Sequence, residues 1–172
     1  MKYHPVRLCV LALLPLIALC PAQADNDKGK TKHLDGKGHV IVTPDQIKWW
    51  PAPASLPPGA QLAILDGDPS KAGLPYTIRA KFPDGYKVPP HWHPVDENVT
   101  VLKGIFGIGR GEKFDPSAGE ELPVGSYSKM PKRMRHFAWV KGETIIQIHG
   151  VGPFVIHYVN PADDPRKKSD SQ

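Results

Sequence analysis

The fold and the chemistry of this chain are both indicated by residues 85–104, which read GYKVPPHWHPVDENVTVLKG. Two prolines, Pro89 and Pro90, favour an extended chain just before His91 and His93. Because alternate side chains of an extended chain point to the same side, we expect both imidazoles on one face. Glu97 follows four residues later and has the same parity. The stretch therefore predicts that two imidazoles and one carboxylate converge.

A second stretch supplies a third imidazole. Gly125 is followed after five residues by Pro131, and His136 then begins another strand-like run. If this strand lies beside the first, four ligands meet: His91, His93, Glu97 and His136. Nitrogen and oxygen ligands of this kind suit one divalent transition metal ion, Mn, Fe, Ni, Cu or Zn. The set contains no thiolate to select a soft ion, and the Irving–Williams order favours Cu or Zn at equilibrium.

Together the two stretches resemble the paired motifs of the cupin family. The first motif, G-x5-H-x-H-x3-E-x6-G, is matched at five positions: Gly85, His91, His93, Glu97 and Gly104. The second motif, G-x5-P-x-G-x2-H-x3-N, is matched at Gly125, Pro131 and His136. It departs from the pattern at Arg133, where glycine is expected, and at Val140, where asparagine is expected. The resemblance covers residues 40–161.

The resemblance implies a small single-domain cupin, an all-β, antiparallel β-barrel of the double-stranded β-helix or jelly-roll type. It also implies a homodimer, and manganese or iron where the chemistry involves oxygen. The metal ligands carry over to the matching positions, because the histidine of the second motif is retained. Since Arg133 replaces the motif glycine, we expect the turn between the two strands to have a different shape.

Composition and periodicity agree with a β-rich fold. The chain holds 20 Pro and 16 Gly among 172 residues, which favours short strands joined by turns. Side chains alternate between apolar and polar over residues 76–82. Further strand-like stretches lie at 62–65, 88–93, 98–102, 105–109, 126–130, 136–140, 144–149 and 154–159. Turn signals at residues 103–104 and 141–142 separate them. A capping sequence at residues 43–46 predicts a short N-terminal helix through Trp49 or Trp50.

The first 24 residues have the features of a secretory signal peptide. Lys2 and Arg7 precede an apolar run over residues 8–19, and residues 22–24 form a small-x-small cleavage site. We therefore expect a periplasmic protein without stable membrane insertion. An uncleaved anchor and a lipoprotein anchored at Cys20 are the alternatives. A flexible polar leader over 25–39, a cupin domain over 40–162 and a disordered polar tail over 163–172 complete the predicted organisation.

Cysteine content and charge exclude some functions. Both cysteines, Cys9 and Cys20, lie in the signal peptide, so disulfides and thiolate catalysis are excluded for the mature chain. Cleavage removes two of the 22 basic residues, which leaves 20 against 17 acidic ones and lowers the net charge from +5 to +3. Seven of these basic residues lie in the polar ends. Such a dilute charge does not indicate a nucleic-acid partner.

Several residues are candidates for a substrate pocket beside the metal. Four apolar side chains of the two motif strands are expected to line it: Val99, Val101, Ala138 and Val140. Arg133 is expected at an anion-attracting rim, with a solvated turn as the alternative. Gln147 and His149 share one parity at the end of an apolar strand. They are candidates to face the substrate, and a place in the core or at the rim is the alternative.

Two functions remain open at this point, with a metal-free structural barrel as a weaker third. The first is a metalloenzyme of dioxygenase or isomerase type, acting on a small oxygen-rich or anionic molecule. Glu97, as a ligand that can detach, would carry the proton in this case, and the motifs offer no other obvious base. The second is a non-catalytic, metal-dependent sensor or carrier of small molecules in the periplasm.

Overall fold

The computed structural model describes residues 38–167. The predicted signal peptide and nearly all of the predicted leader lie outside the described residues. In the described part, the regular elements are nine strands and four short 3-10 helices. The strands are β1 (Trp50–Pro51), β2 (Gln61–Gly67), β3 (Pro75–Phe82), β4 (Lys87–Trp92), β5 (Glu97–Arg110), β6 (Glu120–Leu122), β7 (Tyr127–Met130), β8 (His136–Val151) and β9 (His157–Tyr158). The 3-10 helices are η1 (Pro44–Gln46), η2 (Pro116–Ala118), η3 (Pro161–Asp163) and η4 (Pro165–Lys167).

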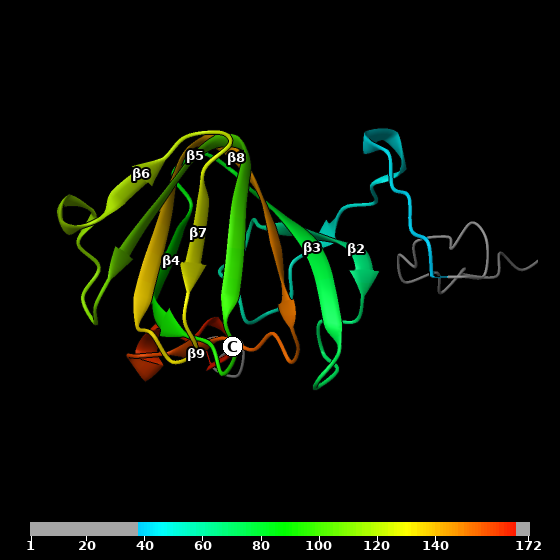
Figure 1. Ribbon diagram of the computed structural model, residues 1–172. Helices are drawn as coiled ribbons and strands as arrows, with labels where there is room; N and C mark the ends of the chain where they lie inside the picture. Colours follow the sequence, from blue (N-terminus) through cyan, green and yellow to red (C-terminus); the bar gives the residue numbers. More distant parts are fainter. Residues whose placement is uncertain (1–37, 168–172) are drawn as a thin grey trace, which may run out of the picture.

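Two long strands, β5 and β8, hold the fold together (Figure 1). The second half of β8 pairs with β3, the first half pairs with β4, and β5 pairs with β8 along both halves. One half of the sheet therefore runs β1-β2-β3-β8-β5-β7, and the other runs β9-β4-β8-β5-β6. All pairings are antiparallel. The predicted all-β, antiparallel barrel is confirmed.

The sheet curls where β5 and β8 bend together. We expected turns at residues 103–104 and 141–142, but each lies inside one continuous strand, so these turn predictions were wrong. Register shifts beside Lys103 mark β-bulges at this point. Gly104 and Gly142 have φ values of 75° and 70°. A bulge bends a strand without ending it, and a glycine provides the left-handed backbone that this requires.

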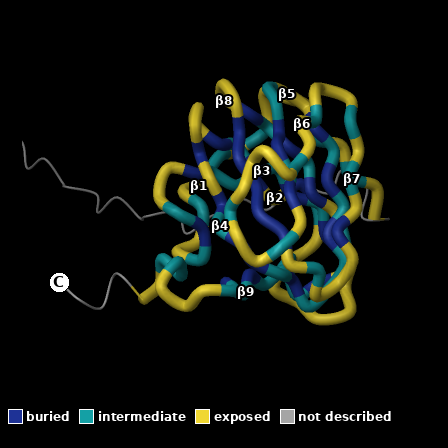
Figure 2. The backbone as a smooth tube through the Cα atoms, turned by 90° about the vertical axis from the view of Figure 1, so that its left-hand side faces the viewer, coloured by how far each residue is buried: buried dark blue, intermediate teal, exposed yellow. Residues whose placement is uncertain are grey.

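The core lies inside the curl. On β3 the side chains of Tyr76, Ile78, Ala80 and Phe82 are buried, and the residues between them are half-buried. Figure 2 shows the same distribution along the chain, with buried segments in the strands and exposed segments at the turns. The inner side chains form one hydrophobic cluster contributed by both halves of the sheet. This burial of apolar surface is the main stabilising contribution to the barrel.

The N-terminal end of the described chain differs from expectation. The expected N-terminal helix is a single 3-10 turn, Pro44–Gln46, and Trp50 already begins β1. At the other end, residues 163–167 of the predicted tail are described and include η4. Arg166 Nη2 donates a hydrogen bond to the Ile156 carbonyl at 3.1 Å, which holds η4 against the barrel. Among residues 38–167, no helix has the length and hydropathy needed to span a membrane.

Candidate metal centre

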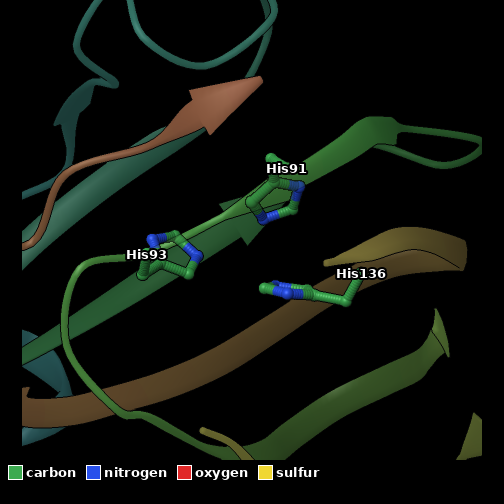
Figure 3. Close-up of side chains that lie close together, drawn as sticks. All are labelled: His91, His93 and His136. Carbon is green, nitrogen blue, oxygen red and sulfur yellow. The ribbon is translucent and has the colours of Figure 1, made fainter. Parts of the chain in front are cut away.

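Three histidines, His91, His93 and His136, point toward one another (Figure 3). His91 of β4 and His136 of β8 are direct cross-strand partners, so their side chains share one face of the sheet. His93 is the first residue after β4 and lies in the connection to β5, from which its ring approaches the other two histidines. The three potential ligand nitrogens all lie within 4.8 Å of one another. The structure thus brings together all three imidazoles that the motif spacing predicted.

The prolines before His91 produce a local irregularity that serves the site. The register of β4 against β8 shifts between Val88 and His91, across Pro89 and Pro90. Proline cannot donate to the hydrogen-bond ladder, and bulges are where strands accommodate it. At this irregularity the Pro89 carbonyl lies 2.7 Å from Nδ1 of His91. The proline pair therefore extends the chain and also orients the first ligand.

Each imidazole is oriented by a backbone carbonyl. The contacts join Nδ1 of the ring to an oxygen that can only accept, so Nδ1 carries the proton and Nε2 is left with its lone pair. The partners are Pro89 at 2.7 Å from His91, Val155 at 2.8 Å from His93 and Met134 at 2.9 Å from His136. Backbone support of this kind fixes the tautomer and the ring orientation of metal-binding histidines.

Glu97, the first residue of β5, places its carboxylate beside the imidazoles. Its Oε2 lies 3.3 Å from Nε2 of His93 and 3.4 Å from Nε2 of His136. Glu97 is only 6 % exposed, and the three histidines are 2–4 % exposed. His93 Nε2 is buried without a hydrogen-bond partner among the described residues. A buried nitrogen with a free lone pair beside a carboxylate fits a cation at this point.

The electrostatics of the cluster favour the metal-binding forms of His91 and Glu97. Burial, reinforced by the nearby His136 and His93, holds the pKa of His91 well below its usual value, so this ring is neutral at neutral pH. Burial alone would raise the pKa of Glu97, but the nearby imidazoles of His93 and His136 lower it strongly. Burial also opposes protonation of His93, yet the carboxylate of Glu97 raises the pKa of this ring. An ionised carboxylate and a neutral imidazole are the states that bind metal.

A small cavity of about 40 Å³ lies inside the barrel at the cluster. Apart from His91, His93, Glu97 and His136, its lining is entirely apolar and includes Phe82, Phe106, Ala138 and Phe154. A water molecule needs roughly 10–15 Å³ of such space. The cavity therefore has room for one or a few water-sized ligands beside the imidazoles.

Solved structures of several proteins share this arrangement of strands. A putative acetylacetone dioxygenase from Methylibium petroleiphilum PM1 is 20% identical, with a TM-score of 0.56 over 74% of this chain and 85% of its own. The polyketide cyclase RemF from Streptomyces resistomycificus is 17% identical, with a TM-score of 0.55 over 77% and 93%. An RmlC-like cupin from Shewanella frigidimarina NCIMB 400 is 14% identical, with a TM-score of 0.51 over 64% and 88%.

The chain has the cupin fold. At these identities the likeness shows the fold alone. No family model matches the sequence, and no curated protein matches it either. The likeness to cupins is therefore visible in the two sequence motifs and in the fold, whereas comparison of the whole sequence does not detect it. The histidines that the structure brings together are those at the ligand positions of both motifs, His91, His93 and His136.

The apolar residues predicted for the pocket take two different places in the barrel. Ala138 lines the cavity, as predicted. Val99, Val101 and Val140 are buried, at 0 %, 1 % and 4 % exposure, in the core around the cavity, but they are not among its lining residues. They belong to the hydrophobic cluster of the core, and their contact with a ligand stays a prediction.

Gln147 and His149 do not line this cavity, and their predicted place beside a substrate stays a prediction. They alternate on β8 with Ile146 and Ile148, which line the cavity, and therefore point to the opposite face of the cupin barrel. Gln147 accepts a hydrogen bond from Arg79 Nε at 3.2 Å, and His149 is exposed. Because residues 145 and 146 are both isoleucine, the sequence alone left it open which parity faces inward.

Arg133 occupies the glycine position of the second cupin motif in a left-handed conformation. Its φ is 62°, a value that glycine adopts readily. The expected difference in the shape of the turn stays a prediction. The Arg133 N–H donates to the His93 carbonyl at 2.7 Å, which ties the loop to the metal ligands. The side chain is exposed, which leaves the predicted rim role untested.

Two aromatic residues of the site were missed. Phe154 stacks on His93, with ring centroids 4.9 Å apart and planes at 16°, and its ring is also 5.8 Å from that of Tyr76. Tyr76 was predicted as an inward residue of an alternating strand, but no spacing linked it to the histidines. Phe154 follows a stretch of glycine and proline that gave no sign of a ligand contact. The supporting carbonyl of Val155 was missed for the same reason.

Proposed function

We propose that this protein is an exported, periplasmic metalloenzyme of dioxygenase or isomerase type that acts on a small oxygen-rich or anionic molecule. His91, His93, Glu97 and His136 would hold one divalent transition metal ion, Mn, Fe, Ni, Cu or Zn. The observation that carries the proposal is the convergence of three imidazoles whose Nδ1 atoms are all committed to backbone carbonyls. A homodimer is part of the proposal, as an expectation from the cupin family.

A metal at these ligands supplies Lewis-acid chemistry, and redox chemistry as well if it is Mn, Fe, Ni or Cu. The protein contributes the rest. The carbonyl-bound imidazoles fix the geometry, and the apolar walls keep bulk water away from the reacting oxygen. Glu97, whose carboxylate lies beside two of the histidines, is the group that can release an oxygen and take up a proton from a bound substrate.

Two observations bear on the substrate. Acetylacetone and polyketides, named for two of the similar structures, are oxygen-rich compounds, and this agrees with the proposed class. The cavity of about 40 Å³ admits only water-sized ligands, whereas pockets for larger molecules have several hundred Å³. A substrate of three or more carbons therefore needs part of the lining to move. Phe154 is only half-buried and stands directly on His93, so we expect this ring to move.

The apolar lining also supports a second function. Besides the four proposed ligands, the lining residues of the cavity carry no titratable group. A metal-dependent carrier or sensor needs a ligand site of this kind but no separate acid or base. We therefore keep metal-dependent binding of a small molecule, without turnover, as the alternative.

Turnover separates the two functions. The metal-loaded protein is incubated with a panel of enediols, catechols and β-dicarbonyls while oxygen uptake and product formation are recorded, beside His91→Ala as the control without metal. The enzyme proposal predicts turnover that depends on the metal and is absent in the control. Saturable binding of a panel member without turnover contradicts the enzyme proposal for that panel and favours the carrier.

A further inference from the structure

The hydroxyl group of Tyr76 is a second buried polar atom without a hydrogen-bond partner. Among the described residues, Tyr76 Oη and His93 Nε2 are the two buried side-chain polar atoms in this condition. Tyr76 is only 2 % exposed, so its hydroxyl has no bulk water to bind. An unpaired buried hydroxyl is destabilising and is rare in native proteins. Its retention in the core needs an explanation that packing does not give, since phenylalanine would fill the same space.

The sheet register directs Tyr76 toward the metal centre. Tyr76 of β3 pairs with Gly150 of β8. Asn98 of β5 pairs with His149, so Glu97 and Gly150 lie at the next position of that ladder. Tyr76, Gly150 and Glu97 therefore form one inward-facing row across three neighbouring strands. Because the middle residue is glycine, no side chain stands in this row between the tyrosine ring and the Glu97 carboxylate.

The contacts over Gly150 agree with this direction. A Cβ atom at Gly150 would lie 3.3 Å from the Tyr76 hydroxyl oxygen and 3.1 Å from the carbonyl oxygen of Asp96, the residue before Glu97. The Tyr76 ring thus extends over Gly150 to the start of β5. Burial, and after it the charge of Glu97, raises the pKa of Tyr76, so the phenol keeps its proton at neutral pH. Phe154 contacts both Tyr76 and His93 and so connects the two unpaired groups.

We propose that the Tyr76 hydroxyl donates a hydrogen bond to an anionic oxygen or nitrogen of the ligand that binds at the metal centre. The inference rests on the proposed function, because it requires a metal at His91, His93, Glu97 and His136. The ligand class is a small anion that coordinates the metal by one atom and accepts a hydrogen bond through another. Movement of the Phe154 ring gives such a ligand access to the hydroxyl.

The test uses the mature protein loaded with Co²⁺, whose visible spectrum reports its ligands, and azide as the anion. Tyr76→Phe removes only the hydroxyl oxygen. Tyr158→Phe is the matched control, since Tyr158 is also buried and near His91, but its hydroxyl already donates to the Ser55 carbonyl at 2.8 Å. We expect Tyr76→Phe to take up one Co²⁺ per chain and to bind azide about 10- to 100-fold more weakly, the range for a hydrogen bond to a charged acceptor. Tyr158→Phe keeps the azide affinity of the wild type.

Thermal unfolding of the metal-free proteins gives an independent measurement. Tyr76→Phe leaves the Tm unchanged or higher, because an unpaired hydroxyl is removed, whereas Tyr158→Phe lowers it. The role of Tyr76 is overturned if Tyr76→Phe and the wild type bind azide equally well. It is also overturned if the wild type takes up Co²⁺ but binds no azide. Neither result contradicts the metal centre itself. A fall in Tm for Tyr76→Phe as large as that for Tyr158→Phe shows that the hydroxyl is already paired and also overturns it. A wild type that takes up no Co²⁺ overturns the metal centre together with this role.

Discussion

The bend of β5 and the loop between β7 and β8 both contain a left-handed residue, yet only one of them requires glycine. At the bend, a side chain on Gly104 would meet the Thr144 hydroxyl and would come within 2.7 Å of the Glu143 carbonyl. In the loop, Arg133 takes φ 62° with its side chain in solvent. The bend is therefore held by steric fit, whereas the loop is held by backbone hydrogen bonds that do not depend on the side chain. The candidate metal ligand His136 lies just after the loop that contains Arg133.

The largest effect is expected from Gly104→Ala. The left-handed backbone costs about 1–2 kcal/mol for a residue with a Cβ atom, and overpacking adds about 1–3 kcal/mol. We expect a loss of about 3 kcal/mol in the free energy of unfolding, measured by urea denaturation of the metal-free protein. Gly142→Ala is the matched control, because Gly142 has φ 70° but no atom within 4 Å of the added methyl group. Equal losses in the two variants would contradict the steric account of the bend.

The second effect concerns Val140, the other departure from the second motif. Val140 is 4 % exposed and belongs to the hydrophobic core. Val140→Asn restores the motif residue but buries an amide in this core, which we expect to destabilise the barrel by about 2 kcal/mol. Val140→Ala, which removes volume without adding polarity, is the control. If Val140→Asn instead raised the Co²⁺ affinity at unchanged stability, asparagine would have a place at the metal centre that the structure does not show.

Substitution of Arg133 is expected to have a smaller effect and to raise, rather than lower, the free energy of unfolding. Arg133→Gly relieves the left-handed strain of about 1–2 kcal/mol but adds about 0.5–1 kcal/mol of backbone entropy to the unfolded chain. The net expectation is a gain of about 0.5–1 kcal/mol in stability with unchanged Co²⁺ affinity, measured by thermal unfolding and metal titration. A fall in metal affinity would show that the arginine side chain serves the site.

The smallest effect is expected at Asp96, which anchors the same loop. Its Oδ1 accepts the Lys132 N–H at 2.8 Å, and its Oδ2 pairs with Lys129 Nζ at 2.8 Å. Hydrogen bonding from Lys129, and then from the Lys132 backbone, lowers the pKa of Asp96 below the usual 3.8. The anchor therefore contributes its full stability above pH 4 and loses it as the pH falls through the lowered pKa. Asp96→Ala should lower the Tm more than Asp96→Asn, which keeps an acceptor for the Lys132 N–H. An equal Tm in both variants at pH 7 would contradict this anchor.

The ligand histidines could be predicted from the sequence because their spacing has a simple geometric meaning. His91 and His93 lie two residues apart on an extended chain, and the structure brings them to His136 as expected. Their supporting carbonyls could not be predicted, since Val155 is 62 residues from His93 and its carbonyl has no sequence signal. The inward face of β8 depends on the bulges at the bend, which residue types do not reveal. The sequence therefore could not show on which face of β8 Gln147 and His149 lie.

The metal content of the wild-type protein tests the central claim most directly. We would purify the wild-type protein without added metal and measure transition metals by elemental analysis, beside His136→Ala prepared in the same way. The account predicts about one ion per chain in the wild type and none in the variant. A wild type without metal that also binds none on reconstitution would contradict the metal centre, as would equal metal content in the two proteins.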